Sequence, residues 1–137
     1  MALFADDELG RKREDPSLPL NENYVKAFAA IDGDDNQHVL VAELAGEVVG
    51  ILQITFIQYL SRRGSMRGVV ESVRVSSGLR GGGIGSKLMQ EAIEICRKQG
   101  CYLVQLTTDR QRERTRKFYE TLGFETSHHG MKLFLEN

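Results

Sequence analysis

The stretch VRVSSGLRGGGIGSKLMQEAIEICRKQG, residues 73–100, contains three successive patterns that decide the fold. It begins with alternating apolar and polar side chains, which predict the end of a β-strand over residues 69–75. Four glycines then fall within the five positions 81–85. A stripe of apolar residues at helical spacing follows and predicts a helix that starts at residue 84 and stops at Gly100. The predicted order is therefore strand, glycine-rich turn, helix.

A glycine-rich turn at the start of a helix is a favourable place for a phosphate group. The first N–H groups of a helix lack partners, and the helix macrodipole adds partial positive charge there. Glycines let a phosphate approach this backbone closely. Arg80 adds a fixed positive charge directly before the glycines. We expect the loop to bind phosphate, and the alternative is a flexible connection between strand and helix.

Two common phosphate-binding patterns are absent from the sequence. A P-loop requires GxxxxGK[ST], and no glycine is followed by lysine and then serine or threonine. The dinucleotide pattern GxGxxG also fails, because the sixth position is Ser86 when counted from Gly81 and Leu88 when counted from Gly83. These mismatches argue against a nucleoside triphosphatase and against a Rossmann cofactor.

The segments before this stretch predict two helices and then strands. We expect a weakly amphipathic helix over 3–14 and a second helix over 21–31, for which Asn21 is a good N-cap. The run HVLVAELAGEVVGILQITFI, residues 38–57, predicts an antiparallel hairpin that turns at Ala45-Gly46. A basic loop then leads to the strand over 69–75.

The segments after the stretch predict one helix and three short strands. CYLVQLT, residues 101–107, is an apolar run that predicts a buried strand, and a basic helix should follow from about 110 to 122. FETSHH and MKLFLE, residues 124–129 and 131–136, are expected to complete the sheet as antiparallel strands. A strand–helix–strand crossover within a mostly antiparallel set indicates a mixed α/β fold.

Composition and charge limit the class of protein. The chain has 137 residues, 41% hydrophobic and 27% charged, which fits one domain over residues 1–137. It has no apolar stretch long enough for a membrane span or a signal core, so we expect a cytoplasmic protein without membrane contact. Nine acids and four bases lie in residues 1–35, against ten acids and fourteen bases in 36–137. This basic excess is too small for nucleic-acid binding but suits one small polyanionic ligand.

The two cysteines do not indicate a metal site or a disulfide framework. Cys96 and Cys101 form no CxxC pair, and no Cys/His set has metal-ligand spacing. We interpret both as reduced core residues in preference to catalytic ones. No metal is expected.

Two segments resemble motifs of one enzyme family. Arg80-Gly81-Gly82-Gly83-Ile84-Gly85 fits the pattern [Q/R]-x-x-G-x-[G/A], which resembles the acetyl-CoA-binding motif of the GNAT superfamily of N-acetyltransferases. RKFYETLGF, residues 116–124, is similar to a later segment of the same family, and the two occur in the expected order. The resemblance implies a mixed, mostly antiparallel central sheet flanked by helices. The family's first strand is missing, because the chain begins within what corresponds to the family's first helix.

The resemblance also implies a cofactor site. Backbone groups of Val73 and Val75 would pair with the pantetheine arm of acetyl-CoA in the manner of an added strand, which requires this strand to separate from its neighbour. The pyrophosphate would be held by the turn and the first helical residues. These residues are Arg80, Gly81, Gly82, Gly83, Ile84, Gly85 and Ser86.

Two side chains correspond to the family's catalytic positions. Tyr119 corresponds to the usual general acid, and Glu71 to a frequent position of the general base. The reaction requires such groups, because an amine must lose a proton before it attacks and the departing thiolate must gain one. The alternative for Tyr119 is a packing role beside Phe118. The alternative for Glu71 is a salt bridge with Arg74 or with an arginine of the loop over 62–67.

The expected function is therefore transfer of an acetyl group from acetyl-CoA to a primary amine by direct attack in a ternary complex. The acceptor is an unidentified small molecule or peptide, which we expect to contact the N-terminal helices and the loop over 58–67. A non-catalytic domain that binds or senses acyl-CoA is the alternative. An exposed sheet edge favours pairing with another edge, so the sequence is also compatible with a homodimer.

Overall fold

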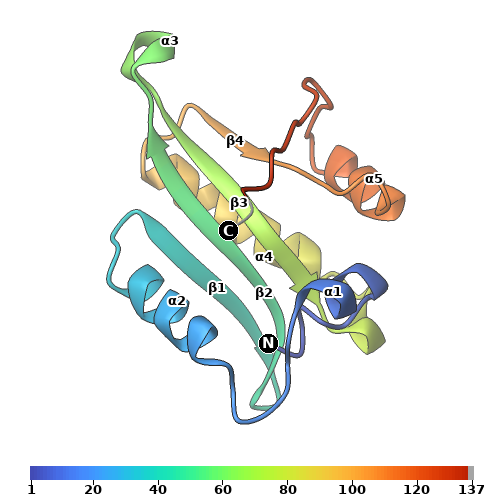
Figure 1. Cartoon of the computed structure of the whole chain (residues 1–137). Coiled ribbons are helices and arrows are strands. Elements are labelled where there is room, and N and C mark those ends of the chain that lie inside the picture. The colour runs from blue at the N-terminus through green and yellow to red at the C-terminus, as the bar shows by residue number, and fades with distance from the viewer. Residues whose placement is uncertain (136–137) are drawn as a thin grey trace. The chain divides into compact units, whose positions relative to one another are not determined.

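The computed structural model describes residues 1–135 (Figure 1), and its contacts divide the chain into two compact units. The first unit is residues 1–106 and the second begins at Thr107. Among the described residues, the first unit contains the sheet and most helices, and the second contains one helix. The prediction of a single domain over residues 1–137 depends on how these units are joined, and it stays a prediction.

The first unit is built on a sheet of four strands in the order β1-β2-β3-β4. β1 and β2 are antiparallel, and so are β2 and β3. β3 and β4 are parallel, and the helix α4 (Ile84–Lys98) connects them in the chain. The mixed, mostly antiparallel sheet predicted from the sequence is confirmed. The strands are β1 (Gln37–Leu44), β2 (Glu47–Gln58), β3 (Met66–Val75) and β4 (Leu103–Leu106).

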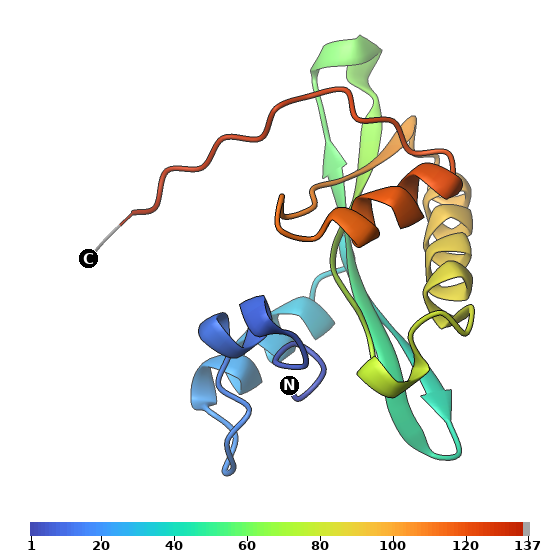
Figure 2. The same cartoon turned by 90° about the vertical axis from the view of Figure 1, so that its right-hand side faces the viewer.

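Helices lie on both faces of this sheet, as Figure 2 shows. α4 covers one face, and α1 and α2 lie on the other. Within residues 1–135 two helices precede the first strand. The predicted N-cap of α2 is confirmed, because the Asn21 side chain accepts from the Asn23 N–H at 2.9 Å. The helices of this unit are α1 (Glu8–Arg13), α2 (Glu22–Asp32), α3 (Ser61–Gly64), α4 (Ile84–Lys98) and the 3-10 turn η1 (Ser77–Leu79).

The core lies between α4 and the middle of the sheet. The predicted apolar stripe of α4 faces inward, and its buried members are Leu88, Met89, Ala92 and Cys96. The buried sheet side chains are Val49, Leu52, Ile54, Phe56, Val69 and Val70. The helix lies close to β3 at Gly68, where a Cβ would stand 2.3 Å from the Cys96 Sγ atom. Glycine at this position allows the contact.

The second unit contains α5 (Glu113–Thr121) and an irregular segment. The strands predicted over 124–129 and 131–136 are wrong for residues 124–135, which contain no helix or strand, and residue 136 lies outside the described residues. The pattern of MKLFLE suits a strand, but a strand exists only where its backbone groups find a partner. In the structure Met131 and Leu133 are 94% and 85% exposed. Within residues 1–135, no helix is both long enough and apolar enough to cross a bilayer.

Candidate active site

Strand β3 extends beyond β4, its parallel partner. In the described sheet, no strand pairs with the last residues of β3 on that side. The pairing joins Arg67–Val70 to Leu103–Leu106 and stops there, whereas β3 continues to Val75. Ser72 has a φ of 57°, and the register between β2 and β3 shifts nearby. A non-glycine residue at positive φ and a register shift both mark a local distortion of a strand. β3 is therefore open along residues 71–75, as the pantetheine site implied by the resemblance requires.

The backbone of Val75 faces this open side. Ser76 donates its N–H to the Val49 carbonyl at 2.8 Å, so these two residues form a hydrogen-bonded pair of the antiparallel ladder. Hydrogen-bonded and non-hydrogen-bonded pairs alternate along such a ladder. Val75, opposite Gly50, is therefore in a non-hydrogen-bonded pair, and its N–H and C=O point away from β2. This orientation suits the predicted contact with pantetheine.

Arginine side chains bind the carbonyls of both residues predicted to contact pantetheine. Arg74 donates from Nη1 to the Val73 carbonyl at 2.7 Å. Arg80 donates from Nε to the Val75 carbonyl at 3.2 Å. A ligand that adds to this strand meets carbonyls that already accept a hydrogen bond.

The glycine-rich turn places two residues in the left-handed region before α4. Gly81 and Gly83 have φ angles of 85° and 88°, and Gly83 is the N-cap of the helix. No side chain caps this N-terminus, so the N–H groups of its first turn have no side-chain acceptor at the cap. The N–H of Gly82 donates to the Leu79 carbonyl at 3.2 Å and stabilises the turn itself. The geometry fits an anion in front of α4.

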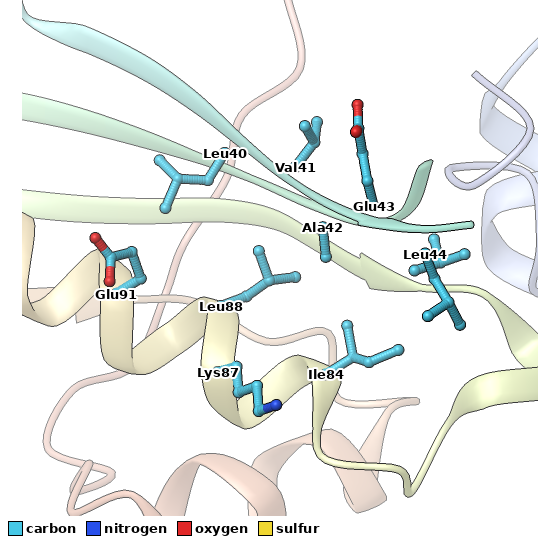
Figure 3. Close-up of a pocket in the computed structure, with 10 residues that line it drawn as sticks. Leu40, Val41, Ala42, Glu43, Leu44, Ile84, Lys87, Leu88 and Glu91 are labelled. Atoms are coloured by element: carbon cyan, nitrogen blue, oxygen red, sulfur yellow. The ribbon is translucent and has the colours of Figure 1, made fainter. Parts of the chain in front are cut away.

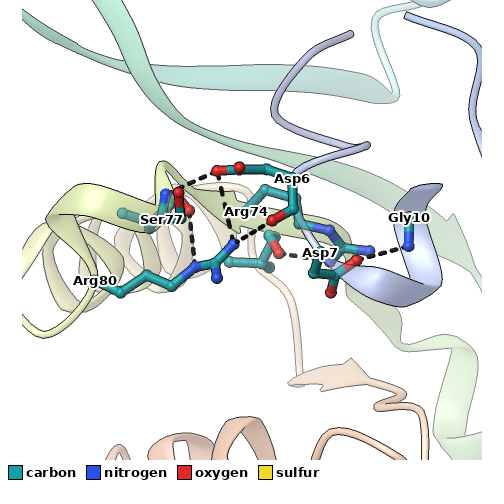
Figure 4. Close-up of polar contacts among 8 residues, drawn as sticks. Asp6, Asp7, Gly10, Arg74, Ser77 and Arg80 are labelled. Carbon is teal, nitrogen blue, oxygen red and sulfur yellow. Dashed lines mark hydrogen bonds and ion pairs between the residues drawn. The ribbon is translucent and has the colours of Figure 1, made fainter.

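Arg80 also binds the N-terminal segment, as Figure 4 shows. Its Nη2 atom lies 3.8 Å from a carboxylate oxygen of Asp6 and donates to the Asp6 backbone carbonyl at 3.3 Å. The same carboxylate oxygen accepts from the Ser77 N–H at 2.7 Å. Arg80, whose charge is predicted to attract phosphate, thus also interacts with Asp6, which the sequence analysis did not single out. Asp6 lies 74 positions from Arg80, so no local pattern indicates the contact.

Glu71 is exposed on the open part of β3, opposite Gln53 of β2. Within residues 1–135 it forms no ion pair with Arg74 or with an arginine of 62–67, so the alternative role considered for it is not seen. Its carboxylate is available to solvent or to a substrate near β3.

Tyr119 belongs to α5 in the second unit and is buried. Its ring packs against Phe118 at a centroid distance of 5.2 Å and against Phe124 at 5.8 Å. The RKFYETLGF motif thus forms the end of one helix and a small aromatic cluster. The packing role considered for Tyr119 is real, and its role as an acid stays a prediction.

An apolar groove of about 410 Å³ lies between β1 and the first half of α4 (Figure 3). Its lining includes the apolar residues Leu40, Leu44, Ile84 and Leu88, together with the charged residue Lys87. Neither Glu71 nor Tyr119 belongs to its lining. We assign this groove no part in a reaction.

The cysteines fit the interpretation made from the sequence. Both are free, Cys96 is buried and Cys101 is half-buried. Burial, with a smaller contribution from Cys101, raises the pKa of the Cys96 thiol to about 12. A thiol protonated at neutral pH is a poor nucleophile. In the part of the chain that the structure describes, no group of three His, Cys, Asp or Glu side chains could hold a metal ion.

Comparison with known families agrees with the motifs and the fold. The profile of the "Acetyltransferase (GNAT) family" matches residues 5–124. The chain belongs to this family. The family predicted from the two motifs is therefore confirmed, and the match includes β3, the glycine-rich turn and α5.

Relatives within the GNAT family carry several descriptions. The glucosamine 6-phosphate N-acetyltransferase of Trypanosoma brucei brucei is 36% identical over 90 residues, which are 66% of this chain and 59% of that protein. The aminoalkylphosphonate N-acetyltransferase of Salmonella typhimurium is 34% identical over 101 residues, which are 74% of this chain and 65% of that protein. The chain thus covers less than two thirds of either relative. A solved structure of a transcriptional regulator from Bacillus halodurans C-125 has 49% identity and a TM-score of 0.95, over 98% of this chain and 89% of that chain.

Proposed function

We propose that this GNAT family member is an N-acetyltransferase that moves the acetyl group of acetyl-CoA to a primary amine. One observation carries the proposal: an open strand, a turn with two left-handed glycines and an uncapped helix N-terminus follow one another directly in the chain. An open strand suits the amide-containing pantetheine arm, and the helix N-terminus suits the pyrophosphate.

The cofactor would lie along β3 and end at α4. The N–H of Val75 points to the open side and would donate to pantetheine. The N–H groups from Gly83 to Ser86 would bind the pyrophosphate, while Gly82 supports the turn through its bond to Leu79. Arg80 would contribute positive charge while it remains tied to Asp6. All these groups belong to residues 1–106.

The reaction we propose is a direct attack in a ternary complex. Glu71 takes a proton from the ammonium form of the acceptor, because only the neutral amine has a free electron pair. The nitrogen attacks the thioester carbonyl carbon, and a backbone N–H on β3 stabilises the oxygen of the tetrahedral intermediate. The carbon–sulfur bond then breaks, and the Tyr119 hydroxyl gives its proton to the departing thiolate. The nitrogen's second proton passes through solvent to the Tyr119 phenolate, and Glu71 releases the first proton to solvent, so both side chains return to their starting state. The products are an amide and coenzyme A.

For the acceptor we propose a small amine that carries a phosphate or phosphonate group. The names of the two curated relatives mention glucosamine 6-phosphate and an aminoalkylphosphonate, which share these two features. A basic turn of this chain fits such a group, because Arg62 and Arg63 are adjacent in α3 with φ angles of 48° and 60°. Strained backbone of this kind often occurs at binding sites. Arginine side chains bind phosphate groups through paired, charge-assisted hydrogen bonds.

The experiment that tests the function measures release of coenzyme A thiol. Acetyl-CoA is incubated with glucosamine 6-phosphate, an aminoalkylphosphonate, amines that lack phosphorus, and peptides. We expect turnover with at least one amine, and faster turnover with amines that carry phosphorus. Thermal unfolding provides a second test: acetyl-CoA at a hundredfold excess over its dissociation constant should stabilise the protein by about 2.7 kcal/mol. ATP and NAD should have little effect.

A second candidate function is a non-catalytic domain that binds acyl-CoA. It is favoured by one observation, the description of the 49% identical structure as a transcriptional regulator. Such a domain would keep the glycine-rich turn but have no use for a base or an acid. Tight binding of acetyl-CoA without turnover of any amine in the panel would support it against the enzyme.

We also propose that the protein forms a homodimer. The segment after α5 carries large apolar side chains that are mostly exposed, namely Met131, Leu133, Phe134 and Leu135. Exposed apolar side chains gathered in one segment favour burial against another chain. Light scattering should give the mass of a dimer, and Leu133→Lys should shift the mass toward that of a monomer.

A further inference from the structure

The carboxylate of Asp6 is bonded to the connection between β3 and the glycine-rich turn. One oxygen of Asp6 accepts from the Ser77 N–H at 2.7 Å, at the first residue of η1. The same oxygen lies 3.8 Å from Nη2 of Arg80, the residue directly before Gly81. Asp6 therefore holds this short connection near both of its ends, as Figure 4 shows.

The Arg80 side chain extends this contact to β3. Its Nη2 donates to the Asp6 carbonyl at 3.3 Å, and its Nε donates to the Val75 carbonyl at 3.2 Å. One guanidinium thus joins the last residue of the strand to the N-terminal segment. Because a guanidinium is planar and rigid, it fixes the directions of the groups that it joins. The backbone that leads into Gly81 is restrained from both sides.

The N-terminal segment is itself held in place. Asp7 caps α1, and its side chain accepts from the Gly10 N–H at 2.6 Å. Gly10 is buried against the backbone, since a Cβ there would stand 1.8 Å from the Phe4 carbonyl oxygen. Phe4 in turn donates its N–H to the Met1 carbonyl at 3.0 Å. Asp6 therefore reaches the turn from a folded segment.

We propose that Asp6 is a positioning residue for the phosphate-binding turn: it acts through Ser77 and Arg80 and does not touch the cofactor. The proposal rests on the proposed function, since it assumes that the turn binds the phosphates of acetyl-CoA. A carboxylate close to a phosphate site should by itself repel the ligand. Positioning and repulsion change the affinity in opposite directions, so the sign of the change decides between them.

The experiment compares four proteins and two ligands. Asp6→Ala removes both contacts, whereas Asp6→Asn removes the charge but keeps an oxygen that can accept from Ser77. Asp34→Ala is the matched control, because Asp34 also accepts from a backbone N–H (Asn36, 2.9 Å) and from a side chain (Gln37, 2.9 Å), but at the start of β1. The wild type is the fourth protein. The ligands are acetyl-CoA and S-acetylpantetheine, which has the same thioester arm without the phosphates, and circular dichroism checks that each variant is folded.

We expect the dissociation constant for acetyl-CoA to rise about tenfold in Asp6→Ala and about threefold in Asp6→Asn. The dissociation constant for S-acetylpantetheine should be the same in all four proteins, and Asp34→Ala should match the wild type with both ligands. A general loss of structure would weaken both ligands equally, and that result would overturn the proposal.

Two other results would also decide against Asp6 as a positioning residue. Tighter binding of acetyl-CoA by both Asp6 variants would mean that the carboxylate only repels phosphate. Unchanged binding would mean that the turn keeps its geometry without Asp6. A wild type that does not distinguish acetyl-CoA from S-acetylpantetheine would instead overturn the phosphate-binding turn of the proposed function, and this inference with it.

Discussion

Gly81 and Gly83 lie two positions apart with nearly the same left-handed backbone conformation, at φ angles of 85° and 88°. A Cβ at either position would meet no atom within 4 Å, so the restriction is conformational and not one of space. An ordinary residue in this conformation costs roughly 1–2 kcal/mol. A β-branched side chain is worse suited still, and it would stand in the open space before α4 where we expect phosphate.

Replacing Gly83 by valine should therefore weaken acetyl-CoA binding by about tenfold or more in a protein that stays folded. Gly46 offers a matched control, because it has a φ of 82° and equally open surroundings but lies in the turn between β1 and β2. Gly46→Val should lower stability by a similar amount and leave the affinity unchanged. Calorimetric titration measures both affinities. Equal affinity in wild type and folded Gly83→Val would remove the phosphate-binding role of this turn.

Tyr119→Phe should lower turnover by roughly 10²–10⁴-fold and leave the affinity for acetyl-CoA nearly intact, if the hydroxyl protonates the thiolate. Phenylalanine keeps the ring that packs against Phe118 and Phe124, so the fold should survive. Steady-state kinetics and a binding titration on the same sample measure the two quantities. A parallel loss of binding and turnover would show that the hydroxyl serves the structure and not the proton transfer.

Glu71→Gln should also lower turnover and leave the affinity for acetyl-CoA nearly intact. Glutamine keeps the size of the side chain but cannot take a proton from the amine, so only the chemical step should slow. Gln53 is opposite Glu71 on β2, so Gln53→Glu is a control that adds a carboxylate without removing the proposed base. Full activity of Glu71→Gln on a genuine amine acceptor would leave acetyl transfer in place but assign the base to another group.

Gly68 and Cys96 provide a test of the packing of α4 on the sheet. Gly68→Ala brings a Cβ to 2.3 Å from the Cys96 Sγ atom and should cost roughly 1–3 kcal/mol of stability. Cys96→Ala removes that sulfur, so Gly68→Ala should cost clearly less in the Cys96→Ala background. Denaturant unfolding of the four proteins gives the coupling free energy. The same cost in both backgrounds would contradict the contact.

The parts of the fold that the sequence predicts well are those whose signal is local. Apolar residues recur at helical spacing in α4, and the side chains that this pattern predicts to face the core, such as Leu88 and Met89, are buried. The hairpin of β1 and β2 turns at Ala45 and Gly46, both at positive φ, where the sequence breaks between two β-rich runs. Periodicity and turn chemistry contain this information without reference to the rest of the chain.

The parts that the sequence does not predict depend on distant partners. MKLFLE has the composition of a strand, but whether Met131 and its neighbours pair is decided by a partner outside the segment. The contact between Asp6 and Arg80 joins residues 74 positions apart, and an aspartate near the N-terminus of a chain gives no sign of it. The distortion of β3 at Ser72 has no glycine to mark it.

The most direct test of the central claim is an NMR titration of the ¹⁵N-labelled protein with acetyl-CoA. We predict that the largest changes in backbone amide shifts fall on Gly81 to Ser86 and on Val73 and Val75, with small changes for Gly46. Coenzyme A should reproduce the changes in the turn. The account would be contradicted if saturating acetyl-CoA left the amide shifts of Gly81 to Ser86 unchanged. It would also be contradicted if the largest amide shift changes fell on a different part of the sheet.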